Sequence, residues 1–155
     1  MNVNFKEAGI TADVVFGKNI TIVKPVNLYG CTIGDNSFIG PFVEIQKNSR
    51  IGGHCRIQSH SFVCEGVTIG DHCFVGHGVM FINDDLSSGR PAGDPDKWKP
   101  TNIGNHVSIG SNATILPVNI CDQVVIGAGA VVTKDIIKAG IYAGNPATFI
   151  RNVER

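Results

Sequence analysis

A large aliphatic or aromatic residue recurs every six positions through the middle of the chain. This row comprises Ile33, Ile39, Ile45, Ile51, Ile57, Val63, Ile69, Val75 and Phe81. A second row, two positions earlier in each hexapeptide, is small or β-branched and comprises Ser37, Val43, Ser49, Cys55, Ser61, Val67, Cys73 and Val79. A period of six is typical of a parallel β-helix, in which each hexapeptide supplies a short strand and a corner. Three hexapeptides make a triangular coil of about 18 residues, so side chains one coil apart are expected to stack.

The same period marks the extent of the repeat. Ile10, Phe16, Ile22 and Leu28 keep the spacing one position out of phase, and the row resumes at Ile103. The pattern therefore predicts an all-β fold over residues 1–135, with roughly six coils that bury their large residues by stacking on one another.

Two segments depart from the repeat. Residues 82–102 hold three of the seven prolines, four aspartates and the only tryptophan. A loop this long inside a solenoid is usually functional, so we expect it to protrude beside a site. The repeat ends before residues 136–155. These residues are expected to cover the end of the prism, and a short helix is one structure that could form this cap.

Composition narrows the class of protein further. The chain has 19 Ile and 17 Val but 3 Leu, a ratio that excludes a helix-dominated fold because β-branched residues favour strands. Thirteen basic and thirteen acidic residues cancel, so no net field would attract nucleic acid or a membrane surface. Residues 1–10 lack a signal-peptide pattern, which predicts a cytoplasmic protein. The five cysteines form no Cys-x-x-Cys pair and are expected to be reduced.

The C-terminal part carries a family resemblance. Residues 126–135 read IGAGAVVTKD, and residues 143–151 read AGNPATFIR. These stretches resemble the hexapeptide-repeat acyltransferases that use acyl-CoA. The resemblance implies a left-handed parallel β-helix, acetyl-CoA as co-substrate, and a homotrimer with sites between adjacent subunits.

The same resemblance implies positions for coenzyme A. Backbone amides around Gly110 and Ala128 would face the pantetheine arm. The residues expected around the adenosine and phosphate end are Thr133, Lys134, Pro146 and Arg151. Small residues allow a thin chain close to the backbone, and the cations suit phosphates. The alternative is that the glycines are only corners and the cations only a solvated cap.

A second group of residues suggests the acceptor. Residues 63–71, which contain Glu65-Gly66-Val67-Thr68, and the Asn83-Asp84 pair resemble N-acetyltransferases that act on nucleotide-linked amino sugars. The resemblance implies that Glu65, Asn83 and Asp84 bind the amine and hydroxyls of the sugar. Such enzymes often have Pro-Arg after the Asn motif, whereas this chain has Arg90 followed by proline, which leaves the register of Arg90 as a substrate-binding residue open.

The spacing of Glu65 and Asn83 supports a site independently of the resemblance. They are one coil of 18 residues apart, so they are expected to share a corner beneath the long loop. The alternative for Glu65 is a solvated corner carboxylate.

The five histidines fall two or three residues after a core aliphatic, which predicts outward corner positions. His54 and His72 are one coil apart and should stack, as should Cys55 and Cys73. His77, the closest of the five in sequence to the loop, is the candidate general base and catalytic residue for a hydroxyl acceptor. A neutral sugar amine held in line needs no such base, and Asn83 would then orient it.

Three functions remain open from the sequence. The first is transfer of an acetyl group from acetyl-CoA to the amine of a nucleotide-linked deoxyamino sugar. The second is O-acetylation of a saccharide with His77 as base, and the third is a noncatalytic scaffold. Some hexapeptide β-helices bind zinc through a Gly-His-x-x-x-x-His step, but this chain has Ile82 at the last position, so no metal is expected.

Overall fold

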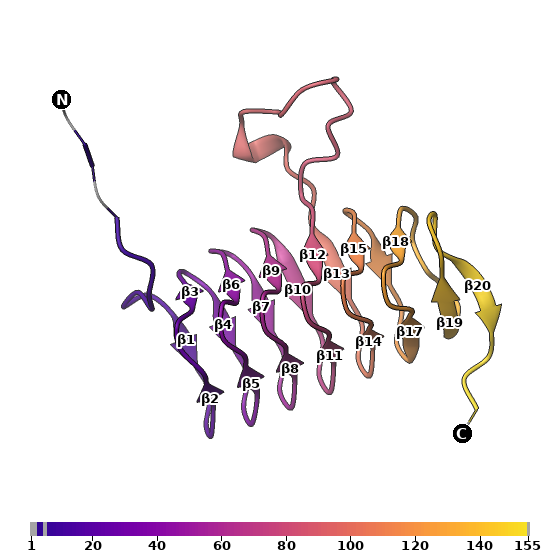
Figure 1. Ribbon diagram of the computed structural model, residues 1–155, viewed down its shortest axis with the longest axis horizontal. Helices are drawn as coiled ribbons and strands as arrows, with labels where there is room; N and C mark the ends of the chain where they lie inside the picture. Colours follow the sequence, from indigo (N-terminus) through magenta and orange to yellow (C-terminus); the bar gives the residue numbers. More distant parts are fainter. Residues whose placement is uncertain (1–2, 5, 155) are drawn as a thin grey trace.

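The chain winds into a left-handed parallel β-helix of three sheets, shown in Figure 1. The computed structural model describes residues 3–4 and 6–154. Sheet A contains β3 (Asn27–Leu28), β6 (Glu44–Ile45), β9 (Phe62–Val63), β12 (Met80–Phe81), β15 (Thr114–Ile115) and β18 (Val131–Val132). Sheet B contains β1 (Val15–Phe16), β4 (Thr32–Ile33), β7 (Arg50–Ile51), β10 (Val67–Ile69), β13 (Thr101–Ile103) and β16 (Asn119–Ile120). Sheet C contains β2 (Thr21–Ile22), β5 (Phe38–Ile39), β8 (Arg56–Ile57), β11 (Phe74–Val75), β14 (Ser108–Ile109), β17 (Val124–Ile126), β19 (Gly140–Ala143) and β20 (Thr148–Arg151).

Both predicted rows lie inside the prism. Every residue of the large row from Ile33 to Phe81 is buried, and so is every residue of the small row from Ser37 to Val79. The hydroxyls within the small row are satisfied by backbone carbonyls, as in the hydrogen bond that Ser61 Oγ donates to Gly76 O at 2.8 Å. The six-residue period therefore identified the core correctly.

The corners of the prism have a common backbone form. In most corners one residue has a positive φ. Among the described residues this corner residue is asparagine, histidine, glutamine or glycine, with the single exception of Phe42. Leu86, which also has a positive φ, lies in the long loop. Short polar side chains and glycine tolerate this left-handed conformation, so the corners explain much of the glycine and asparagine content. We name the corners by the sheets they join: A/B, B/C and C/A.

Histidines form a ladder along the B/C corner. The rings of His54 and His72 stack at 4.7 Å between centroids, and those of His72 and His106 stack at 4.9 Å. The predicted stacking of His54 on His72 is confirmed.

The two ends of the prism differ from the sequence expectation. At the N-terminal end Ile10 and Phe16 are 37% and 40% exposed, because the described residues form no coil on that side of the first turn. At the other end Ile136 is buried in a bridge with Ile120, so the solenoid continues past residue 135. Its cap is the antiparallel hairpin β19–β20 and not a helix.

The predicted loop protrudes from the A/B corner between β12 and β13 (Figure 1). It is two residues shorter than expected, because Thr101 and Asn102 already belong to β13. The described residues contain no α-helix, and their single 3-10 helix, Pro95–Lys97, lies in this loop. None of the described helices is long and apolar enough to span a bilayer.

Candidate functional site

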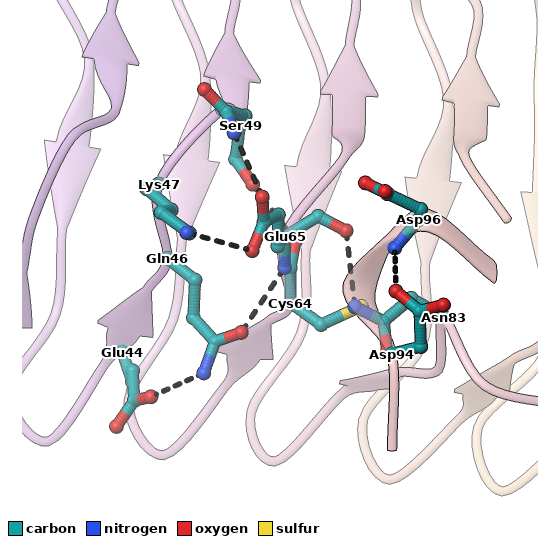
Figure 2. Close-up of polar contacts among 10 residues, drawn as sticks. Glu44, Gln46, Lys47, Ser49, Cys64, Glu65, Asn83, Asp94 and Asp96 are labelled. Atoms are coloured by element: carbon teal, nitrogen blue, oxygen red, sulfur yellow. Dashed lines mark hydrogen bonds and ion pairs between the residues drawn. The ribbon is translucent and has the colours of Figure 1, made fainter. Parts of the chain in front are cut away.

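Glu65 and Asn83 share the A/B corner, as their spacing predicts. Asn83 Nδ2 donates a hydrogen bond to the backbone oxygen of Glu65 at 3.2 Å. Figure 2 shows the two residues side by side at the base of the loop. The contact uses the amide nitrogen of Asn83, and no hydrogen bond from the described residues reaches its Oδ1. That oxygen is available to an N–H or O–H donor of a ligand.

The Glu65 carboxylate is held in place from the preceding coil. Asn48 Nδ2 donates to Glu65 Oε1 at 2.8 Å, and Lys47 Nζ lies 3.8 Å from Oε2. Gln46 accepts a hydrogen bond from the Glu65 backbone N–H at 3.1 Å and donates to Glu44 Oε1 at 2.9 Å (Figure 2). The side chain of Glu65 is 17% exposed, so it is oriented and still reachable.

Tyr29 lies close to the same two carboxylates. Burial raises the pKa of its phenol, and the charges of Glu44 and Glu65 raise it further. Its hydroxyl therefore stays protonated near neutral pH and is a hydrogen-bond donor. Sequence reasoning did not identify Tyr29, Glu44 or Gln46. A spacing of two coils would have found Tyr29, which precedes Glu65 by 36 residues. Gln46 precedes Glu65 by 19 residues and so lies one position off the coil spacing.

Asp84 is half-buried and accepts hydrogen bonds from two backbone N–H groups of the loop. Its Oδ1 accepts from Leu86 N–H at 3.0 Å, and its Oδ2 accepts from Ala92 N–H at 2.7 Å. Lys99 N–H donates to Asn83 O at 2.9 Å, which closes the base of the loop. Because Asp84 holds the backbone of Leu86 and of Ala92, its loss would disturb the loop as well as any ligand.

Arg90 is exposed at the far part of the loop. It lines a pocket of about 200 Å³ that also includes Asp84, Asp85 and Lys99. The ammonium of Lys99 pairs with Asp85 and holds the pKa of that carboxyl at about 2. Arg90 and Asp84 thus line the same pocket, and Arg90 is exposed.

His77 lies at a different corner from Glu65 and Asn83. It follows β11 at the C/A corner, whereas Asn83 follows β12 at the A/B corner, so sheet A separates them within one subunit. Its backbone N–H donates to Ser111 Oγ at 3.2 Å, and its Nδ1 lies 3.4 Å from the same oxygen. The imidazole is therefore oriented by Ser111 and exposed at that corner.

Three of the residues predicted to bind coenzyme A gather at the C/A corner with His77. Gly110 follows β14, Ala128 follows β17, and Pro146 follows β19. The residue after Pro146, Ala147, is held against sheet A because its N–H donates to Val131 O at 2.8 Å. Gly110 and Ala128 have no side chain larger than a methyl group, and a Cβ on Gly110 would stand 2.4 Å from Ala128 N. The C-terminal coils therefore pack backbone closely against backbone along this part of the C/A corner.

The remaining predicted residues lie elsewhere on the C-terminal coils. Thr133 and Lys134 follow β18 at the A/B corner and are exposed. Arg151 ends β20, where its Nη1 pairs with Glu154 Oε1 at 3.2 Å. One subunit therefore does not gather all six residues at one place.

One large pocket among the described residues is lined by none of the predicted site residues. It measures about 610 Å³ and lies between sheet C and the C-terminal tail, lined in part by His106, Gln123 and Asn152. Among the described residues no group of three or more His, Cys, Asp or Glu side chains could hold a metal ion.

Sequence profiles of two hexapeptide groups match the chain. The bacterial transferase hexapeptide (six repeats) profile matches residues 30–65 and 48–83, and the profile of the hexapeptide repeat of succinyl-transferase matches residues 100–134. Together the matches cover more than half of the chain.

Curated proteins match over a shorter part. Galactoside O-acetyltransferase of Escherichia coli is 51% identical over 55 residues, which is 35% of this chain and 27% of that enzyme. The chloramphenicol acetyltransferase of Agrobacterium fabrum is 50% identical over 62 residues, or 39% of this chain and 27% of that enzyme. The alignments with these relatives span less than a third of their length.

Solved structures match over nearly the whole chain. A variant of AntD, an N-acyltransferase from Bacillus cereus, in complex with dTDP-4-amino-4,6-dideoxyglucose and coenzyme A, has a TM-score of 0.77 and 25% identity. The alignment covers 92% of this chain and 84% of AntD.

Proposed function

Because the chain belongs to the bacterial transferase hexapeptide family, we propose that it transfers an acetyl group from acetyl-CoA to the amine of a nucleotide-linked deoxyamino sugar. The observation that carries the proposal is the A/B corner, where Glu65 and Asn83 meet beneath the loop. The similarity to AntD supports the choice of an amino-sugar nucleotide as acceptor.

The polar groups at this corner suit an amine and its neighbouring hydroxyls. Asn83 Oδ1 would accept a hydrogen bond from the amine, and the Glu65 carboxylate would accept from a hydroxyl. A hydrogen bond to a charged acceptor contributes about 1.5–3 kcal/mol, which is enough to orient a sugar ring. Asp84 contributes by stabilising the conformation of the loop, and Arg90, which lines the same pocket, is a second group for the nucleotide.

Catalysis then follows mainly from positioning. The lone pair of the neutral amine attacks the thioester carbonyl carbon, the carbon–sulfur bond breaks, and the proton lost by nitrogen neutralises the departing thiolate. A backbone amide at the C/A corner stabilises the oxyanion, and no side-chain base is required.

The separation of the two corners favours a site between subunits. The acceptor residues lie at the A/B corner, while His77, Gly110, Ala128 and Pro146 lie at the C/A corner. We propose a cytoplasmic homotrimer in which the A/B corner and loop of one subunit face the C/A corner of the next. Thr133, Lys134 and Arg151 would bind the phosphates of coenzyme A at the C-terminal coils. Sedimentation equilibrium tests the trimer directly.

Thiol release from acetyl-CoA tests the reaction. We expect turnover with nucleotide-linked amino sugars and none with the matching hydroxyl sugars. Turnover restricted to hydroxyl sugars would contradict the proposal, and absence of acetyl-CoA binding would favour a scaffold.

Substitutions test the site. Glu65→Gln removes the charge but keeps the shape, and we expect it to lower kcat/KM for the acceptor by about 10- to 100-fold while the affinity for acetyl-CoA stays unchanged. Glu7→Gln, an exposed glutamate far from the corner in sequence, is the matched control. Normal acceptor kinetics in Glu65→Gln would show that this corner does not bind the acceptor.

O-acetylation is the second candidate, favoured by the contact of His77 with Ser111 and by the similarity to galactoside O-acetyltransferase. In that case His77→Ala should lower kcat by about 100-fold or more, because His77 would remove the hydroxyl proton. An unchanged kcat in His77→Ala excludes the base.

A further inference from the structure

Phe42 occupies a position that does not suit it. It lies at the C/A corner with a φ of 61°, where the other corners have asparagine, histidine, glutamine or glycine. A bulky residue in the left-handed region is an outlier, since its Cβ crowds the following carbonyl group. The side chain is also 57% exposed. Neither the backbone nor the core of this subunit accounts for a phenyl ring at this position.

One face of the ring is already covered. Phe42 stacks on His60, with the ring centroids 4.8 Å apart and an angle of 26° between the planes. On the opposite side, toward the preceding coil, lies a pocket of about 310 Å³. Its lining comprises Ala8, Pro25, Val26, Asn27, Phe42, Val43 and Glu44.

The pocket combines apolar walls with a polar end. Pro25 and Val26 lie on one side and the phenyl ring on the other, while Glu44 presents a carboxylate that already accepts from Asn27 Nδ2 at 3.1 Å. A flat aromatic ring with an N–H at its edge matches both features, because it stacks on phenylalanine and donates to a carboxylate oxygen.

We propose that this pocket binds the nucleobase of the acceptor nucleotide, stacked on the Phe42–His60 pair with its edge toward Glu44. The inference rests on the proposed function, which requires a nucleotide beside the A/B corner. It adds a base-binding subsite that involves neither Glu65 nor Asn83.

The position of the pocket fits the reach of such a ligand. Glu44 lies in β6, and Asn83 follows β12 of the same sheet. One strand, β9, lies between them, so the two residues are separated by two strand spacings, or about 9.5 Å, along the prism axis. Lys47, whose side chain is 56% exposed, lies between them at the A/B corner, 3.8 Å from Glu65. A nucleoside diphosphate sugar can therefore extend from the pocket to the corner with its pyrophosphate near the Lys47 ammonium.

The test uses Phe42→Asn in the full-length protein. Asparagine tolerates a positive φ, so this variant removes the ring and is expected to fold at least as well as the original. Isothermal titration measures binding of dTDP, UDP, GDP and ADP, and of acetyl-CoA separately. Loss of one base–aromatic stack should weaken the preferred diphosphate by about 10-fold or more, with acetyl-CoA binding unchanged. Phe42→Trp should restore binding, and Phe74→Ala, which removes an exposed ring from sheet C, should have no effect.

Each other outcome overturns the inference. Unchanged diphosphate affinity in Phe42→Asn shows that the ring does not bind a base. Dissociation of the oligomer in Phe42→Asn, measured by sedimentation at matched concentration, shows that the ring is a subunit contact. If the original protein binds none of the four diphosphates yet transfers acetyl groups to amino sugars, the subsite is wrong and the proposed reaction stands. Failure of acetyl transfer itself contradicts the proposed function.

Discussion

A methyl group added at Gly110 tests how tightly the coils pack along the strip proposed for the pantetheine arm. In Gly110→Ala the new Cβ would stand 2.4 Å from Ala128 N and 2.8 Å from Ala128 Cα. Ordinary van der Waals contact begins at 3.4 Å, so the neighbouring coil must move away by about 1 Å. The atoms met are backbone, so no side-chain rotation can relieve the clash.

The size of the effect follows from that displacement. Gly110 N–H donates to Ile126 O at 2.8 Å, and a shift of about 1 Å takes this hydrogen bond beyond its normal range. Overpacking costs about 1–3 kcal/mol, and each backbone hydrogen bond that is weakened adds about 1 kcal/mol. We expect the free energy of unfolding to fall by about 2–5 kcal/mol, which corresponds to a decrease in Tm of about 5–15 °C in a chain of this size.

Urea unfolding at matched protein concentration measures the change as a lower midpoint with an unchanged m-value. Gly9→Ala is the control, because a Cβ there meets nothing within 4 Å and should change stability by less than about 0.5 kcal/mol. A Gly110→Ala protein as stable as the Gly9→Ala protein would refute the close packing of coils at this corner.

Three further predictions concern the core, the loop and the thiols. Ile57→Ala should lower the free energy of unfolding by about 2–5 kcal/mol, and Phe16→Ala at the open end by less, both read by urea unfolding. The Lys99 ammonium holds the pKa of Asp85 at about 2, below its unfolded value, so its stabilising contribution is present above about pH 4 and is lost as pH falls toward 2. NMR titration of the Asp85 carboxyl should give a midpoint at about pH 2, and Lys99→Met should raise that midpoint. An unchanged midpoint in Lys99→Met would contradict the ion pair between Lys99 and Asp85. Cys121, the one half-exposed cysteine, should react first with a thiol reagent, and an equally fast first phase in Cys121→Ser would contradict this.

The repeat allowed the fold to be predicted nearly in full, because each hexapeptide needs one large and one small inward residue. The ends were harder. Ile10 and Phe16 keep the period but lie half-exposed, since a row is buried only where a coil exists on both sides. At the other end the hairpin β19–β20 replaces the expected cap, because residues 140–143 pair with β17 although they no longer follow the period.

The candidate site was predictable where it depended on coil spacing. Glu65 and Asn83 were placed together on that basis, and Asn83 does contact the Glu65 backbone. Proximity in sequence was a poorer guide, since His77 is six residues before Asn83 yet lies at another corner. The roles of these residues remain predictions, because spacing determines where a side chain lies and not what it binds.

The corner backbone explains why chemistry can be carried by so regular a fold. Glu65, His77 and Ala128 each directly precede the corner residue with positive φ, and that residue is a glycine in all three cases, with φ of +85°, +65° and +69°. The left-handed position is restricted to residues that tolerate it, whereas the position before it keeps an ordinary backbone and accepts any side chain. Phe42 reverses this arrangement by placing a large ring at the restricted position itself, which is why a ligand, rather than the fold, best accounts for it.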